Sequence, residues 1–208
     1  MPIIDLATKV MLGQKLKDLE YGTGIYREAD YYAVKAPVFS FEKLTDVDTG
    51  LGPEMKSTGE VLGLGANMQE ALFKGLVSAG YKVEKSGHAG VLISVNRRDQ
   101  PEIVNIARKL DEMGFRLYAT DGTAREISRL GTDVEVVGKL GRDNRVFQLL
   151  ESGRIDYVIL TGSTEPEYIR DFIHLNHRCV QLGIPCLTSL DTAGALTDIL
   201  ASRYNQEN

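Results

Sequence analysis

Short apolar runs alternate with amphipathic stretches from residue 90 to the end of the chain. The first run, 91–95, contains almost no polar side chain, which is typical of a strand buried on both faces. Pro101 suits the first turn of a helix, and Gly114 can take the left-handed conformation that ends one. Between them, apolar residues recur at helical spacing: Ile103, Val104, Ala107, Leu110 and Met113. The pattern predicts a strand followed by a helix.

The same alternation continues to the C-terminus. Further strands are predicted at 115–119, 133–137, 155–160 and 184–188. Further helices are predicted at 124–130, 144–152, 166–182 and 192–202, the third of them opened by Pro166 and ended by Gly183. Five strands that alternate with helices predict an α/β fold with a five-stranded, doubly wound parallel sheet. Ligands of such sheets bind beyond the carboxyl ends of the strands.

The N-terminal part of the chain has a weaker pattern. We predict a helix from Asp5 to about Leu19, and strand pieces at 31–34 and 38–41 that meet at Pro37, a residue of sheet edges and bulges. A Gly-rich stretch without periodicity follows at 45–65, and we interpret it as a long irregular connection.

A second N-terminal helix has a clear start signal. Asn67 is a suitable N-cap, and Glu70 stands three residues later, as in a capping box. Its apolar face is formed by Leu72, Phe73, Leu76 and Val77, and it ends near Gly80. We therefore divide the chain into an incomplete N-terminal region (1–80), a linker (81–89) and a C-terminal domain (90–208).

The turn Thr120-Asp121-Gly122-Thr123 lies between a predicted strand and a predicted helix. A glycine in such a turn lets backbone N–H groups converge in front of the helix, where the helix dipole adds positive potential. We expect Thr123 to be the N-cap, with two threonine hydroxyls beside the spot. This arrangement suits a phosphate, although the same residues can also form only a turn and a cap.

Composition excludes several classes of function. The net charge of -5 argues against a general nucleic-acid binder, and no apolar run approaches the roughly 20 residues that cross a membrane. We see no secretory signal pattern at the N-terminus. Cys179 and Cys186 lack metal-type spacing, so we expect reduced thiols in a cytoplasmic protein.

Basic residues follow the predicted strand ends in this acidic chain. They are Arg97, Arg98, Lys139, Arg142 and Arg145. Arginine binds phosphate through paired N–H donors, so together these residues favour an anionic ligand at this edge of the sheet. Taken singly, each is better explained as a solvated loop residue.

Catalytic signals are weak. The carboxylates near the strand ends, Asp99, Asp121, Asp143 and Glu165, read as caps and turn residues, and we assign no catalytic residue. His174 and His177 share a helix face without further convergent ligands, so we expect no metal site. There is no Walker loop.

The segment LGPEMKSTGEV at 51–61 closely resembles the signature near the end of the second synthetase unit of carbamoyl-phosphate synthetase large chains. Residues 3–13 and 31–35 resemble the segments that precede it there. From about Gly87 onward, the chain resembles the regulatory domain of the same family, which has the methylglyoxal-synthase-like fold. The resemblance extends over nearly the whole sequence in the family's order.

For the C-terminal domain, the resemblance implies a regulatory site for a phosphorylated nucleotide-type effector: UMP, IMP or phosphoribosyl pyrophosphate. The family's effector-binding positions correspond to Ser94, Thr120, Gly122, Thr123, Lys139, Thr161, Gly162 and Ser163. The chain departs from the family at Gln100, where some relatives carry lysine, and at Leu160, where they carry asparagine. Ala36 replaces a glutamate of ornithine-responsive relatives, which argues against ornithine regulation despite the match at Thr188.

For the N-terminal region, the resemblance implies the tail of an ATP-grasp unit. In the family, the nucleotide-binding lysines and metal ligands lie upstream of this tail, so we predict no synthetase activity for this chain alone. The whole synthetase uses ATP with Mg or Mn to make carbamoyl phosphate for pyrimidine and arginine biosynthesis. The implied partners are the remainder of the large chain, the small glutaminase subunit and a small-molecule effector, with self-association into a homo-oligomer left open.

Two other interpretations belong to different classes of function. The first is a methylglyoxal-synthase-type lyase, which needs an aspartate base in the loop after the third strand; that loop offers only Asp143. The second is an assembly module that binds no ligand. Saturable effector binding without turnover would separate a regulatory domain from both.

Overall fold

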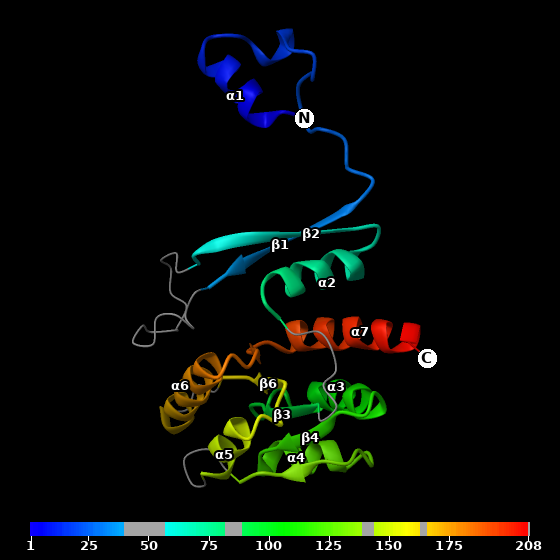
Figure 1. Cartoon of the computed structure of the whole chain (residues 1–208), viewed down its shortest axis with the longest axis vertical. Helices are drawn as coiled ribbons and strands as arrows, with labels where there is room; N and C mark the ends of the chain where they lie inside the picture. The colour runs from blue at the N-terminus through cyan, green and yellow to red at the C-terminus, as the bar shows by residue number, and fades with distance from the viewer. Residues whose placement is uncertain (40–56, 82–88, 139–143, 163–165, 208) are drawn as a thin grey trace.

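The computed structural model describes residues 1–39, 57–81, 89–138, 144–162 and 166–207. Its centre is a five-stranded sheet made of β3 (Gly90–Ser94), β4 (Arg116–Ala119), β5 (Glu135–Val136), β6 (Tyr157–Leu160) and β7 (Cys186–Leu187). The strand order is β5-β4-β3-β6-β7, and every neighbouring pair is parallel. The predicted fold class is confirmed (Figure 1).

Helices cover both faces of this sheet. They are α3 (Gln100–Glu112), α4 (Asp121–Ser128), α5 (Arg145–Glu151), α6 (Pro166–Gln181) and α7 (Leu190–Glu207). Because side chains alternate along β3, Val91 and Ile93 pack into one apolar cluster with α3, α4 and α7. Leu92, between them, packs into a second cluster with α5 and α6 on the opposite face. The double winding therefore produces two buried cores.

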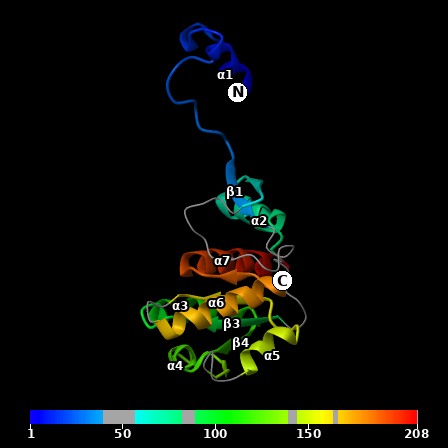
Figure 2. The same cartoon turned by 90° about the vertical axis from the view of Figure 1, so that its left-hand side faces the viewer.

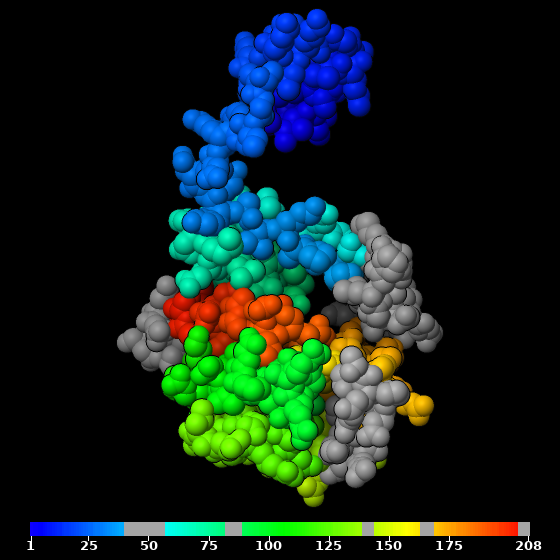
Figure 3. All heavy atoms as spheres, turned by 180° about the vertical axis from the view of Figure 1, so that it is seen from behind, coloured from blue at the N-terminus to red at the C-terminus, as the bar shows by residue number. Residues whose placement is uncertain are grey.

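The N-terminal region forms a smaller unit. It contains α1 (Ile3–Met11), a 3-10 turn (Leu16–Asp18), β1 (Tyr32–Val38), β2 (Gly59–Gly65) and α2 (Met68–Ser78). Strands β1 and β2 pair antiparallel, and α2 packs against them. Figure 3 shows the α1 segment standing apart from the remainder of the molecule.

Two of the predictions for this region are wrong, and one is confirmed. The first helix ends at Met11 rather than near Leu19, because Gly13 takes a φ of 97° and turns the chain. The interpretation of Pro37 as a residue of a sheet edge is confirmed, because Pro37 lies within β1 and β1 has a partner on one side only. Of the strand piece predicted at 38–41, Val38 is the last residue of β1, and 40–41 lie outside the described residues. The stretch predicted as an irregular connection, 45–65, ends in strand β2.

Glycine is the reason that β2 escaped prediction. Gly63 and Gly65 occupy the face of β2 that packs on α2, and both are buried. A Cβ at Gly63 would overlap the backbone of Ala71 and Gly75, so only glycine allows α2 to approach this closely. Of the inward positions 59, 61, 63 and 65, only Val61 carries an apolar side chain, so the alternation that predicts a strand is missing.

The start of α2 is as predicted. The Asn67 side chain accepts a hydrogen bond from the Glu70 backbone N–H at 2.9 Å. The Glu70 carboxylate reaches back and accepts from the Ala66 N–H at 2.8 Å. Together these bonds satisfy donors that would otherwise be free at the helix terminus.

Helix α2 connects the two regions by lying next to α7, as Figures 1 and 2 show. Leu72, Phe73 and Leu76 pack against the first cluster of the α/β domain. The Arg203 guanidinium lies 3.7 Å from the centre of the Phe73 ring. Tyr81, the first residue of the predicted linker, also packs on this cluster, whereas 82–88 lie outside the described residues. No described helix is long and apolar enough to span a membrane.

Candidate functional site

The carboxyl end of β3 is the natural place for a ligand in this sheet. The chain leaves β3 toward β4 and β5 on one side and later returns to β6 and β7 on the other, so the winding reverses between β3 and β6. A crevice forms outside the strands at such a reversal. Here two consecutive backbone N–H groups donate to hydroxyls from opposite sides: Val95 to Thr123 Oγ1 at 3.3 Å, and Asn96 to Thr161 Oγ1 at 2.9 Å.

The turn on the β4 side differs from the prediction in one respect. Thr120, not Thr123, is the N-cap residue, and α4 begins at Asp121. Thr123 is in the first turn of the helix with only 1% of its surface exposed. Its hydroxyl also lies 3.4 Å from the carbonyl oxygen of Val95, to which it donates. The prediction that Thr123 caps the helix is wrong, because its hydroxyl fastens α4 to the end of β3.

The groups around the start of α4 form what we call the hydroxyl seat, defined by Ser94, Thr120 and Gly122. The Thr120 hydroxyl donates to the Ser94 hydroxyl at 3.2 Å, and both residues are half-buried. Gly122 is exposed, and a Cβ at that position would lie 3.1 Å from the Gln100 side-chain nitrogen. A neutral amide donor thus stands beside a helix N-terminus, where backbone N–H groups and the dipole favour an anion.

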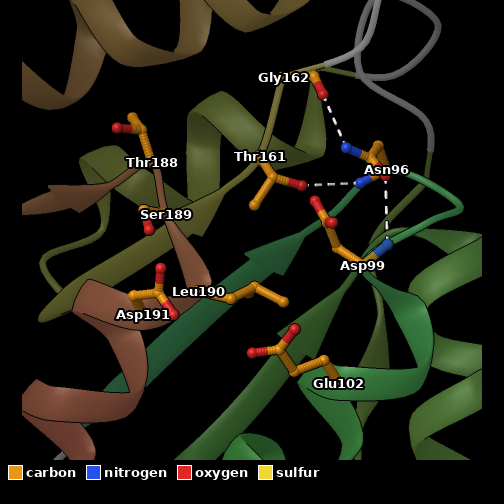
Figure 4. A pocket seen from close by; sticks show the side chains of 9 residues that line it. All are labelled: Asn96, Asp99, Glu102, Thr161, Gly162, Thr188, Ser189, Leu190 and Asp191. Carbon is orange, nitrogen blue, oxygen red and sulfur yellow. Dashed lines mark hydrogen bonds between the residues drawn. The ribbon is translucent and has the colours of Figure 1, made fainter.

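A hollow of about 380 Å³ lies beyond Asn96, on the side of β6 and β7 (Figure 4). Three chain segments line it, 96–102, 161–162 and 188–191, all at the carboxyl ends of strands or the first turns of helices. The lining residues are Asn96, Asp99, Glu102, Thr161, Gly162, Thr188, Ser189, Leu190 and Asp191. Hydroxyl, amide and carboxylate groups predominate, so the hollow suits a polar ligand.

Asn96 organises the entrance to this hollow. Its amide nitrogen donates to the Gly162 carbonyl at 2.9 Å, which ties the end of β3 to the end of β6. Its amide oxygen accepts from the backbone N–H groups of Arg98 and Asp99 at 2.8 and 3.2 Å. These local bonds turn the chain from the strand into α3. Asn96 therefore fixes the positions of Asp99 and Thr161 relative to each other.

The lining of the hollow carries negative charge. Asp99 and Glu102 come from the start of α3, and Asp191 comes from the start of α7. The helix dipoles favour carboxylates at these positions, which are the first turns of two helices. A phosphate in the hollow would meet three carboxylates, whereas ligand hydroxyls or amines could donate to them.

The remaining predicted site residues are placed as follows. Arg97 and Arg98 are exposed in the turn between β3 and α3, and Arg145 is exposed at the start of α5. Thr161 and Gly162 directly follow β6 and border the hollow. Lys139, Arg142 and Ser163 lie outside the described residues, so the predicted basic edge of the sheet stays a prediction.

Sequence reasoning did not identify Glu102, Leu190 and Asp191 as part of a site. Their positions in the sequence could have indicated this, because each residue lies within one helical turn of a segment that follows a strand. It was missed because acidic residues at helix starts are common for dipole reasons alone. Within the described residues, no group of three metal-ligating side chains converges.

Part of the chain matches a known protein family. Residues 102–188 match the model of the MGS-like domain family. Among solved structures, the chain is similar to methylglyoxal synthase from Elizabethkingia anophelis NUHP1, with 24% identity, 52% of this chain and 76% of that chain covered, and a TM-score of 0.43. The family match begins within α3 and ends directly after β7. The region that contains the start of α4 and the ends of β6 and β7, residues 102–188, is therefore an MGS-like domain.

Proposed function

We propose that the crevice at the end of β3 is a regulatory site that binds a nucleoside monophosphate. The observation that carries the proposal is the pair of consecutive amides at Val95 and Asn96, anchored to hydroxyls on opposite sides. This pair puts the hydroxyl seat and the hollow next to each other. The seat offers hydroxyls, the Gln100 amide and a helix N-terminus to a phosphate.

The charge of the hollow supports an effector with a single phosphate group. Carboxylates such as Asp99, Glu102 and Asp191 accept hydrogen bonds from ribose hydroxyls, as acidic residues do in dinucleotide-binding folds. The same carboxylates repel a second phosphate group. UMP and IMP carry one phosphate, whereas phosphoribosyl pyrophosphate carries phosphate groups at both ends of its sugar. The hollow therefore favours UMP or IMP.

In this proposal the site belongs to the large chain of a carbamoyl-phosphate synthetase. The supporting observation is the sequence LGPEMKSTGEV at 51–61, together with the motif order described above. The effector would control ATP-dependent carbamoyl phosphate synthesis by the cytoplasmic full-length enzyme and its glutaminase subunit. Residues 1–80 would be the ATP-grasp tail and 90–208 the regulatory domain, with no catalytic residue in this chain.

One observation favours a second candidate, a methylglyoxal-synthase-type lyase. The hollow contains three carboxylates and begins at Asn96, two residues after Ser94 of the seat, and a carboxylate beside a bound phosphorylated sugar can act as a general base. Release of methylglyoxal from a triose phosphate would establish this activity. A regulatory domain would bind its effector without releasing product.

The test is calorimetric titration of the chain with UMP, IMP and phosphoribosyl pyrophosphate. Thr120→Val and Ser94→Ala remove hydroxyls of the seat, and Ser128→Ala, an exposed change at the other end of α4, is the control. Thr123→Val is unsuitable, because that hydroxyl holds Val95. We expect binding of a monophosphate that weakens about tenfold in each seat variant, in line with loss of one hydrogen bond to a charged group.

A further inference from the structure

The only two cysteines of the chain, Cys179 and Cys186, lie next to each other in the fold. Cys179 is near the end of α6, and Cys186 is in β7, the edge strand of the sheet. Cys179 belongs to the second apolar cluster and Cys186 packs against that cluster, and Cys186 is the neighbour that most raises the pKa of the Cys179 thiol. Nothing in the proposed effector site uses either thiol.

The turn between α6 and β7 holds the two residues together. Gly183 takes a φ of 64°, which ends the helix and reverses the chain. The Ile184 N–H then donates to the Cys179 carbonyl at 2.9 Å, and the Val158 N–H donates to the Pro185 carbonyl at 2.9 Å. The first bond fixes the turn to the helix, and the second fixes it to β6. The two cysteines therefore approach each other across a tight, anchored turn.

The environments of the two thiols differ. Cys179 is fully buried, whereas Cys186 is half-buried. The hydrogen bond with Cys186, and then burial, raise the pKa of the Cys179 thiol, so Cys179 keeps its proton at neutral pH. An oxidant in solution therefore reaches Cys186 first, because Cys179 is buried in the core and Cys186 is partly exposed.

We propose that Cys179 and Cys186 are a redox-responsive pair that closes into a reversible intramolecular disulfide, with Cys186 as the peroxide-reacting sulfur. The Cys186 thiolate attacks a hydroperoxide; an S–O bond forms, the O–O bond breaks, and sulfenic acid and hydroxide result for hydrogen peroxide. The Cys179 sulfur then attacks the Cys186 sulfur; the S–S bond forms, the S–O bond breaks, and water leaves with the Cys179 proton. In total, two thiols lose two electrons and two protons, and peroxide becomes two waters.

The disulfide would tie α6 to the strand that leads directly into the hollow. Thr188 and Ser189 follow β7 and line that hollow. Closing the short ring between Cys179 and Cys186 restricts the unfolded chain and holds this wall of the hollow in place. The pairing itself stands independently of the proposed effector.

The test uses the whole chain, freed of reductant and treated with increasing hydrogen peroxide. Residues 179–203 form a single tryptic peptide with both cysteines, because the first lysine or arginine after Arg178 is Arg203. We expect this peptide to become lighter by two hydrogens, to escape thiol-blocking reagents and to recover on reduction. Disulfide-linked dimers, or two blocked thiols after peroxide treatment, would overturn the proposal.

Two variants assign the roles of the two sulfurs. In Cys179→Ser, the Cys186 sulfenic acid has no resolving partner, so dimedone should label it several-fold more than in the wild type. In Cys186→Ser, the buried Cys179 should stay unlabelled at the same peroxide concentration. Dimedone labelling of wild-type Cys186 at the level of Cys179→Ser would contradict a resolving role for Cys179. The wild-type peptide measurement decides the pairing even where a variant folds poorly.

Discussion

The N-terminal region and the α/β domain differ in how they bury their apolar surface. In the α/β domain, two apolar clusters on opposite faces of one sheet bury large side chains such as Ile103, Ile159 and Leu175. In the N-terminal region, α2 approaches β1 and β2 through buried glycines, and the outer face of β2 leaves Leu62 and Leu64 exposed by 58% and 43%. One region has its own core, whereas the other depends on close backbone packing and on its contact with α7.

The exposed residues of the N-terminal region make this difference clearer. Ile4, Met11, Leu12 and Ile25 each expose more than three quarters of their surface. Apolar surface of this kind is typical of segments that pack against further protein. The α/β domain has exposed apolar residues too, but they are scattered around two closed cores. The α/β domain thus buries its apolar side chains within itself, whereas the N-terminal region leaves much of its apolar surface uncovered.

The largest loss of stability should come from a substitution in the core of the α/β domain. Ile103→Ala removes a fully buried side chain and leaves a cavity, so it should lower the free energy of unfolding by about 2–5 kcal/mol. Leu62→Ala, on the outer face of β2, should cost below about 0.5 kcal/mol. Denaturant titration of both variants measures the difference. Equal costs would mean that the outer face of β2 is buried in solution, against this comparison.

The second largest loss of stability should come from Gly63→Ala and should be confined to the N-terminal region. Gly63→Ala adds a Cβ that overlaps the backbone of α2, and overpacking of this kind costs about 1–3 kcal/mol. Gly59→Ala, in the same strand, meets nothing within 4 Å and is the matched control. Hydrogen exchange should show lost protection in β1, β2 and α2 for Gly63→Ala only. Equal loss in β3 and β4 would show that the two regions unfold as one unit.

The smallest effect concerns the acid sensitivity of α2. Hydrogen bonds from Lys74 and then from the Ala66 N–H lower the pKa of the exposed Glu70 carboxyl. A lowered pKa means that the contribution of Glu70 is present above its unfolded value, near 4.5, and is lost as the pH falls through the folded value.

The measurement is amide protection of α2 between neutral and acidic pH, corrected for intrinsic exchange. The wild type should lose protection below about pH 4.5, whereas Glu70→Gln should lack this acid-dependent part. Glu112→Gln, an exposed change on α3, is the control. An identical acid response in Glu70→Gln and the wild type would exclude Glu70 as its source.

The elements that could be predicted from sequence are those in which buried positions carry apolar side chains at strand or helix spacing. Runs such as 91–95 and the apolar stripe from Ile103 to Met113 predicted β3 and α3, because burial selects apolar residues at strand and helix periods. Strand β2 could not be predicted in this way, because glycines fill its inward positions except Val61, and a single apolar side chain forms no pattern.

The candidate site was predictable in part. Its location followed from the strand ends, and Ser94, Thr120 and Thr161 do lie around the end of β3. The roles of single hydroxyls did not follow, because whether Thr123 faces a ligand or the Val95 backbone depends on a helix start that shifted by three residues. The acidic hollow depends on bringing together α3 and α7, which are distant in the sequence.

Titration of the chain with UMP, IMP and phosphoribosyl pyrophosphate tests whether the hydroxyl seat binds a single phosphate. We expect saturable binding of UMP or IMP, about tenfold weaker in Thr120→Val and unchanged in Ser128→Ala, with phosphoribosyl pyrophosphate binding more weakly than the monophosphate. Preferred binding of phosphoribosyl pyrophosphate, or equal affinities of the wild type and Thr120→Val, would contradict a one-phosphate site built on the hydroxyl seat.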